Sequence, residues 1–127
     1  MESKKILLVE DDPFISEMYT VKFEKSGYAC EVASTGKEGL AKAKEWQPHI
    51  VLLDILIPEM DGFEVLLALK KDAATRAVPV VMLTNLGQKE DIEKGMSLGA
   101  AAYIVKAHFT PQEVLEKVKS VLETNSK

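Results

Sequence analysis

Acidic residues and a lysine directly follow several short apolar runs of this sequence. Glu10 and Asp11 come after the first run, Asp54 after the third and Lys106 after the fifth, while Thr84 adds a hydroxyl after the fourth. Three carboxylates in one place repel one another unless a cation lies among them, and an all-oxygen cluster suits a hard ion such as Mg²⁺. A lysine and a hydroxyl opposite the acids match what the oxygens of a phosphoryl group need. The residue types therefore predict phosphoryl transfer onto a carboxylate.

Asp54 is the best candidate for the nucleophile, because it stands alone after the middle run and is flanked by apolar residues. Glu10 and Asp11 are adjacent and therefore suited to sharing a metal ion. In the expected mechanism, Mg²⁺ bridges Asp54 and the donor phosphoryl group. Lys106 neutralises a second phosphoryl oxygen and Thr84 donates a hydrogen bond to a third. Little chemistry beyond positioning is required of the protein.

Five apolar runs of strand length recur along the chain, at residues 6–9, 28–33, 50–53, 78–83 and 101–105. Their nearly continuous apolar character is typical of strands that are buried on both faces of a parallel sheet. Segments with helical periodicity separate them. The pattern predicts an α/β fold of the (βα)5 type, a doubly wound five-stranded parallel sheet in the order 2-1-3-4-5 within a flavodoxin-like three-layer sandwich. Ligands of such sheets bind beyond the carboxyl ends of the strands, where the candidate residues gather.

Capping signals set the expected helix ends. The first helix should begin at Asp12, which reads as a cap rather than a ligand, with Pro13 in the first turn, and should end at Gly27. Pro48 should stop the second helix and Gly99 should cap the fourth. Three later helices carry the spacing of a capping box. The pairs are Thr35 with Glu38, Asp61 with Glu64, and Thr110 with Glu113.

Size and charge limit the classes of function. With 127 residues, 46% of them hydrophobic, the chain is expected to form a single domain over residues 1–127 with a frayed tail at 123–127. The net charge of -4 is scattered along the sequence, which argues against direct nucleic acid binding and against a polybasic membrane segment. The first apolar run is too short for a signal or a membrane span, so we expect a cytoplasmic location.

Four sequence motifs carry a family resemblance over essentially the whole chain. They are residues 6–13 (ILLVEDDP), residues 54–62 (DILIPEMDG), the Leu83-Thr84 pair, and residues 102–106 (AYIVK). Together, and at this mutual spacing, they resemble the receiver domains of response regulators. Because the four motifs include every candidate residue named above, the resemblance and the residue chemistry indicate the same site.

The resemblance implies a phospho-switch of two-component signalling. Asp54 would accept a phosphoryl group from a histidine kinase or a histidine phosphotransfer protein, and the only catalysis would act on the protein itself, so no enzyme is expected. Thr84 and Tyr103 would act as switch residues that alter the face formed by the fourth helix, the fifth strand and the fifth helix. That face would then control an unknown output protein or a phosphorylation-dependent homodimer. The implied metal ligands are the carboxylates of Glu10, Asp11 and Asp54 and the backbone carbonyl of Leu56.

Two positions depart from the family pattern. Ala107 follows the lysine where the family usually has proline, and Asn85 follows the threonine where it usually has a small residue. Leu56 and Leu86 flank the position of the attacking water in this family, and neither can orient that water, so we expect slow self-dephosphorylation.

Three other functions are alternatives to the phospho-switch. A phosphorylation-independent interaction module with the same fold is the principal alternative. A phosphatase of the haloacid-dehalogenase type would need an aspartate where Leu56 stands. A flavodoxin would have to place an FMN phosphate against residues 10–12, which are all acidic and would repel it.

Overall fold

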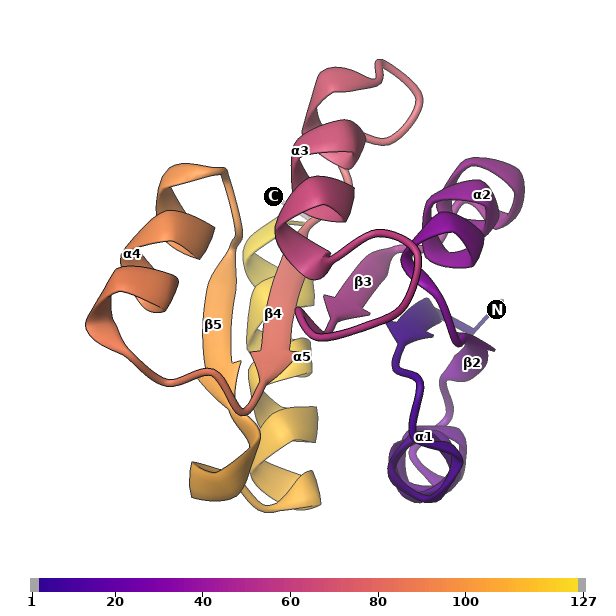
Figure 1. The fold of residues 1–127 in the computed structure, drawn as a ribbon. Coiled ribbons are helices and arrows are strands. Elements are labelled where there is room, and N and C mark those ends of the chain that lie inside the picture. The colour runs from indigo at the N-terminus through magenta and orange to yellow at the C-terminus, as the bar shows by residue number, and fades with distance from the viewer. Residues whose placement is uncertain (1–2, 126–127) are drawn as a thin grey trace.

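The structure is a computed structural model, and it describes residues 3–125. Strands and helices alternate along the described chain (Figure 1). The strands are β1 (Lys5–Val9), β2 (Ala29–Ala33), β3 (Ile50–Leu53), β4 (Val80–Thr84) and β5 (Ala102–Val105). The helices are α1 (Pro13–Lys25), α2 (Gly36–Trp46), α3 (Gly62–Lys71), α4 (Lys89–Ser97) and α5 (Pro111–Asn125), with a 3-10 turn, η1 (Lys106–His108), before α5. The predicted (βα)5 pattern is confirmed.

The five strands form one parallel sheet in the predicted order β2-β1-β3-β4-β5. Val9 of β1 is in register with Leu53 of β3, and Leu53 is in register with Met82 of β4. The carboxyl ends of β1 and β3 are therefore level with each other. Because the next residues after these ends are Glu10 and Asp54, the register alone brings two acids to the same edge of the sheet.

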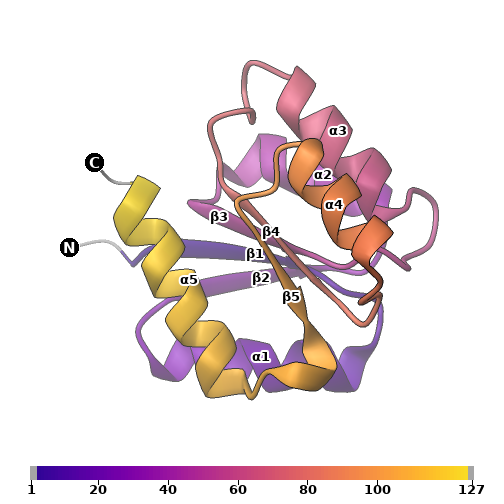
Figure 2. The ribbon, with the colours of Figure 1, turned by 90° about the vertical axis from the view of Figure 1, so that its left-hand side faces the viewer.

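Helices cover both faces of the sheet and give the predicted three layers (Figure 2). Alternate residues of each strand point to opposite faces, so Ile6 and Leu8 of β1 pack with α1 and α5, while Leu7 and Val9 pack with α2 and α3. The central strands β1, β3 and β4 are buried along almost their whole length, whereas β2 and β5 are only partly covered. The expected burial on both faces therefore holds for the three central strands. It does not hold for β2 and β5, because these strands are the edges of the sheet.

The helix ends follow the expected capping residues, with one exception. Asp12 caps α1, and Gly99 follows α4 with a positive φ of 106°, a conformation that glycine adopts without a steric penalty. The reciprocal capping box is present at Asp61 with Glu64 and at Thr110 with Glu113. At α2, Thr35 accepts the N–H of Glu38, but the Glu38 carboxylate accepts the N–H of Ser34 instead of that of Thr35. The predicted bond from the Thr35 N–H to the Glu38 carboxylate is therefore wrong, whereas the bond from the Glu38 N–H to Thr35 is confirmed.

The last helix, α5, continues to Asn125. Residues 123–125 of the tail that we expected to fray are therefore helical, and residues 126 and 127 lie outside the described residues. Between residues 3 and 125, no helix combines the length and the apolar character that crossing a membrane requires.

Candidate functional site

The three predicted acids meet at the carboxyl edge of the sheet. Glu10 and Asp54 extend from the neighbouring strands β1 and β3, and Asp11 follows Glu10. One carboxylate oxygen from each of the three residues lies within 4.8 Å of the others. Glu10 and Asp54 are only 3% and 8% exposed, whereas Asp11 is open to solvent. Two buried negative charges and one exposed one thus share a small space.

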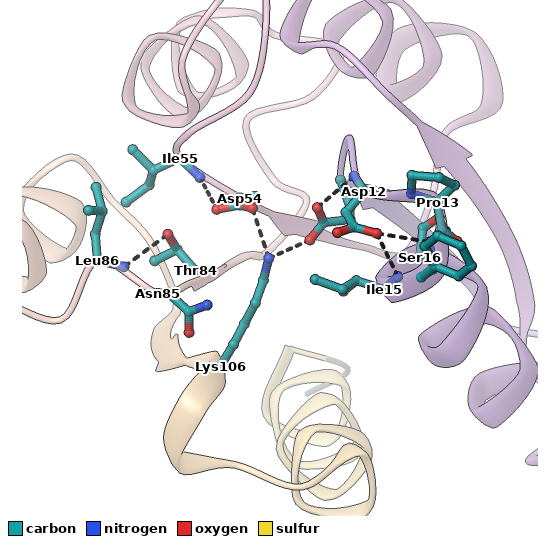
Figure 3. A network of polar contacts seen from close by, with 12 residues as sticks. Asp12, Pro13, Ile15, Ser16, Asp54, Ile55, Thr84, Asn85, Leu86 and Lys106 are labelled. Carbon is teal, nitrogen blue, oxygen red and sulfur yellow. Dashed lines mark hydrogen bonds and ion pairs between the residues drawn. The ribbon is translucent and has the colours of Figure 1, made fainter.

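Lys106 brings an ammonium group between the two buried acids. Its Nζ donates to Oδ2 of Asp54 at 2.8 Å and also to Oε1 of Glu10 (Figure 3). Burial by itself lowers the pKa of Lys106, but the hydrogen bonds and negative charges of Asp54 and Glu10 outweigh that effect and raise the pKa above its ordinary value. Lys106 therefore stays positively charged at neutral pH. The lysine lies where the sequence predicted it.

Backbone amides orient the two buried carboxylates. The N–H of Ile55 donates to Oδ1 of Asp54 at 2.7 Å, and the N–H of Asp12 donates to Oε2 of Glu10 at 3.0 Å. The carboxylate of Asp12 is itself occupied by two amides in the first turn of α1, at 2.9 and 3.2 Å (Figure 3). Asp12 is therefore the predicted helix cap, and its backbone additionally positions Glu10.

Gly62 allows the start of α3 to lie directly against the backbone of Asp54. Its N–H donates to the carbonyl of Ile55 at 2.9 Å. A Cβ atom at position 62 would lie 2.3 Å from the carbonyl oxygen of Asp54. That distance is too short for any side chain, so the backbone would have to shift. Sequence reasoning did not find this contact. An Asp-Gly pair seven and eight residues after the nucleophile signals a turn, but not which backbone the glycine approaches.

The two predicted switch residues, Thr84 and Tyr103, meet at the backbone of Leu86. The Thr84 hydroxyl is buried and accepts the N–H of Leu86 at 3.3 Å, while the Tyr103 hydroxyl donates to the Leu86 carbonyl. The Tyr103 ring packs against Gly95 of α4. Burial, followed by the negative charges of Asp91 and Asp54, raises the pKa of Tyr103 to about 12. A single loop residue after β4 therefore contacts both side chains.

The remaining predicted positions lie in loops around the site. The Leu56 side chain is 67% exposed in the loop after β3, and the metal-binding role of its backbone carbonyl stays a prediction. The two departures from the family pattern contact each other, because the N–H of Ala107 donates to Oδ1 of Asn85 at 3.0 Å. Sequence reasoning treated these two positions separately, since nothing in the sequence shows how the two loops face each other.

Residues 6–119 match the family described as the response regulator receiver domain. The chain belongs to this family. Among solved structures, a CheY-like receiver domain protein of Methanospirillum hungatei is 34% identical, with a TM-score of 0.91 and 98% of each chain covered. The chemotaxis protein CheY4 of Vibrio cholerae is 31% identical, with a TM-score of 0.87 and coverage of 94% of this chain and 98% of that one. The fold and the family are therefore established together.

Curated relatives of this receiver domain include regulators of transcription. RpaA of Synechocystis sp., a DNA-binding dual master transcriptional regulator, is 39% identical over 118 residues, which are 93% of this chain and 48% of RpaA. The alkaline phosphatase synthesis transcriptional regulatory protein PhoP of Bacillus subtilis is 38% identical over 120 residues, or 94% of this chain and 49% of PhoP. The chain spans about half the length of these relatives. Their names give no support to the expectation that this protein does without nucleic acid contacts.

Membership of the family makes this chain a signalling domain of two-component systems rather than a conventional enzyme. Receiver domains generally bind Mg²⁺, and the oxygen donors at the carboxyl edge fit such an ion. Three carboxylates face the single ammonium of Lys106 there, which leaves two negative charges for a divalent cation to neutralise.

Proposed function

We propose that residues 1–127 form a single receiver domain that acts as a phospho-switch, with Asp54 as the acceptor of the phosphoryl group. The donor would be a histidine kinase or a histidine phosphotransfer protein. The observation that carries the proposal is the pairing of the buried Asp54 carboxylate with Lys106 at 2.8 Å, beside two further carboxylates within 4.8 Å. An acid alone would repel a phosphoryl donor, whereas this arrangement supplies both the nucleophile and the positive charge.

The proposed reaction is an in-line displacement at phosphorus. A carboxylate oxygen of Asp54 forms the new bond to phosphorus, and the bond from phosphorus to the donor's imidazole nitrogen breaks. The imidazole keeps that electron pair and takes up a proton. The N–H of Ile55 holds the Asp54 carboxylate in a fixed orientation beforehand, which lowers the entropic part of the barrier.

Positive charge at the site offsets the charge that develops on the phosphoryl oxygens. Lys106 would donate to one oxygen, and the Thr84 hydroxyl would donate to another once it is released from the Leu86 amide. Glu10, Asp11, Asp54 and the backbone carbonyl of Leu56 would hold Mg²⁺. When bound, Mg²⁺ would supply the further positive charge that the transferring group requires.

The phosphoryl group adds roughly two negative charges, which can draw the Thr84 hydroxyl away from Leu86. The Leu86 carbonyl also accepts a hydrogen bond from the Tyr103 hydroxyl. A movement of the loop that carries Leu86 would therefore change the position of the Tyr103 ring against α4. The face formed by α4, β5 and α5 would then bind an output protein, whose identity is open, or a second copy of the chain. The proposed location of the protein is the cytoplasm.

Intact-mass measurement tests the proposal. The parent protein, incubated with Mg²⁺ and acetyl phosphate, should gain the mass of one phosphoryl group, and the gain should disappear with EDTA. The Asp54→Asn variant should show no gain, while the control Asp72→Asn, at a partly exposed carboxylate that follows α3, should behave as the parent does. If the parent stays unmodified with acetyl phosphate and with a panel of histidine kinases, the phosphorylation-independent interaction module becomes the better account.

A further inference from the structure

A side chain links the two loops that border the site. Asn85 directly follows Thr84 at the end of β4, and Ala107 directly follows Lys106 in η1. The N–H of Ala107 donates to Oδ1 of Asn85 at 3.0 Å, across a separation of 22 residues in sequence. Each partner thus lies one residue beyond a residue of the proposed site.

The hydrogen bond also fixes how the Asn85 amide is turned. A backbone N–H can only donate, so Asn85 must direct its oxygen toward Ala107 and its NH₂ group elsewhere. Figure 3 shows the Asn85 side chain beside Thr84 and Lys106. Because Asn85 is exposed, its side chain would otherwise be free to take several rotamers, and the bond selects one of them.

The bond continues the connection between β4 and β5 beyond the end of their ladder. The pairing of the two strands ends with Thr84 opposite Val105. Lys106 therefore stands between Val105, which the sheet holds, and Ala107, which Asn85 holds. An anchor on both sides limits the movement of the Lys106 backbone. It thereby limits the positions that the long side chain can give its ammonium group.

We propose that Asn85 is a positioning residue for Lys106 and that it acts through the N–H of Ala107. The contact requires an N–H at position 107, which proline would lack. The bond therefore joins the two departures from the family pattern, with Asn85 as the acceptor and a residue other than proline at position 107 as the donor. The predicted effect on phosphorylation rests on the proposed function, whereas the contact itself does not.

Two single variants break the bond from opposite sides. Asn85→Leu keeps a side chain of similar size but removes the acceptor, and Ala107→Pro removes the donor. The initial rate of phosphorylation by acetyl phosphate should fall about two- to tenfold in each, as expected for the loss of one hydrogen bond. The double variant should be no slower than the slower single variant, because both changes delete the same interaction. Losses that multiply in the double variant would overturn the proposal.

Two controls separate the bond from general effects on the loops. Ala107→Gly keeps the N–H and should retain the parent rate to within about twofold, the lower limit of the effect expected for one hydrogen bond. Gln88→Ala changes an exposed side chain of the same loop as Asn85, one that makes no capping bond to α4, and should also match the parent. An equal fall in either control would contradict the assignment.

A third comparison tests whether Asn85 acts through Lys106. In a Lys106→Met background, Asn85→Leu should cause no further loss of rate, because the group that it positions is absent. A residue that contacts the phosphoryl group directly, or that merely stabilises the fold, would still lower the remaining rate. A further loss in that background would therefore overturn the proposal.

Hydrogen exchange of the Ala107 amide gives a readout that needs no phosphorylation. The amide should exchange slowly in the parent and in Gln88→Ala, and distinctly faster in Asn85→Leu. If the parent accepts no phosphoryl group, the proposed function fails while this measurement still tests the contact. An Ala107 amide that exchanges equally fast in the parent and in Asn85→Leu would refute the contact whatever the phosphorylation results.

Discussion

Replacing Lys106 by methionine should destabilise the protein strongly in the absence of Mg²⁺. The variant keeps a side chain of similar length but removes the ammonium group that lies between Glu10 and Asp54. The Lys106 side chain is 10% exposed, and those of Glu10 and Asp54 are 2% and 11% exposed, so water can compensate little for the loss. The change therefore leaves two buried carboxylates facing each other.

The size of the effect follows from the geometry. Carboxylate oxygens within 4.8 Å repel each other by about 3.5 kcal/mol at an effective dielectric constant of about 20. Removing one partner of a buried ion pair typically costs about 3–5 kcal/mol. We therefore expect a loss of about 3 kcal/mol in the free energy of unfolding near neutral pH, at the lower end of that range. Saturating Mg²⁺ should restore more stability to the variant than to the parent.

The pH dependence of the difference has a definite direction. The folded-state pKa of Lys106 is raised above its ordinary value of 10.5, so the ion pairs stabilise the fold in full below that pH. Their contribution is lost as the pH rises through the raised pKa. The parent and Lys106→Met should consequently differ at neutral pH and approach each other in strongly alkaline solution.

Urea unfolding followed by circular dichroism in EDTA measures the difference. Lys42→Met is a suitable control, because it removes a surface ion pair with Glu31 in which both side chains are more than one third exposed. That control should change stability little. A loss below about 1 kcal/mol for Lys106→Met, or a loss no greater than that of the control, would refute the reasoning about a buried charge cluster.

Three further predictions concern the switch region and the lifetime of the phosphoryl group. Gly95→Ala places a Cβ about 3.1 Å from the Tyr103 ring and should displace the ring. The chemical shifts of the ring protons would detect this displacement, and unchanged shifts would show that the ring has room. The Tyr103 phenol should titrate near its raised pKa of about 12. The protonated phenol therefore stabilises the fold in full below pH 10.0, and this stabilisation is lost as the pH rises toward 12. The difference in phenolate absorbance between the parent and Tyr103→Phe measures this, and a step near 10.0 would contradict it. Leu56→Asn should lose its phosphoryl group faster than the parent because an amide can orient water, and equal decay rates would count against that role.

Much of the fold could be predicted because buried parallel strands have a simple sequence signature. Residues 50–53 are entirely apolar and form the buried strand β3, and the acid that follows them lies at the sheet edge as expected. The limits of β4 differ from the prediction. The fourth apolar run was expected at 78–83, but β4 begins at Val80, since Pro79 has no N–H with which to join the ladder. At its other end, β4 extends one residue beyond the expected run, so Thr84 lies inside the strand and not after it.

Contacts within the site were harder to predict, because they depend on the conformations of loops. Topology places Glu10, Asp54 and Lys106 at one edge, but not which oxygen pairs with the ammonium. The sequence predicted Thr84 and Tyr103 as switch residues through resemblance alone. That both bond to the backbone of Leu86 follows from the path of the β4–α4 loop, which no periodicity encodes.

The most direct test of the central claim is the identification of the modified residue. The protein would be treated with acetyl phosphate and Mg²⁺, reduced with borohydride, which converts an acyl phosphate of aspartate into homoserine, and mapped by peptide mass spectrometry. The proposed function predicts homoserine at position 54 and unmodified Glu10 and Asp11. Modification at either of those acids, or at none of the three, would contradict the role assigned to Asp54.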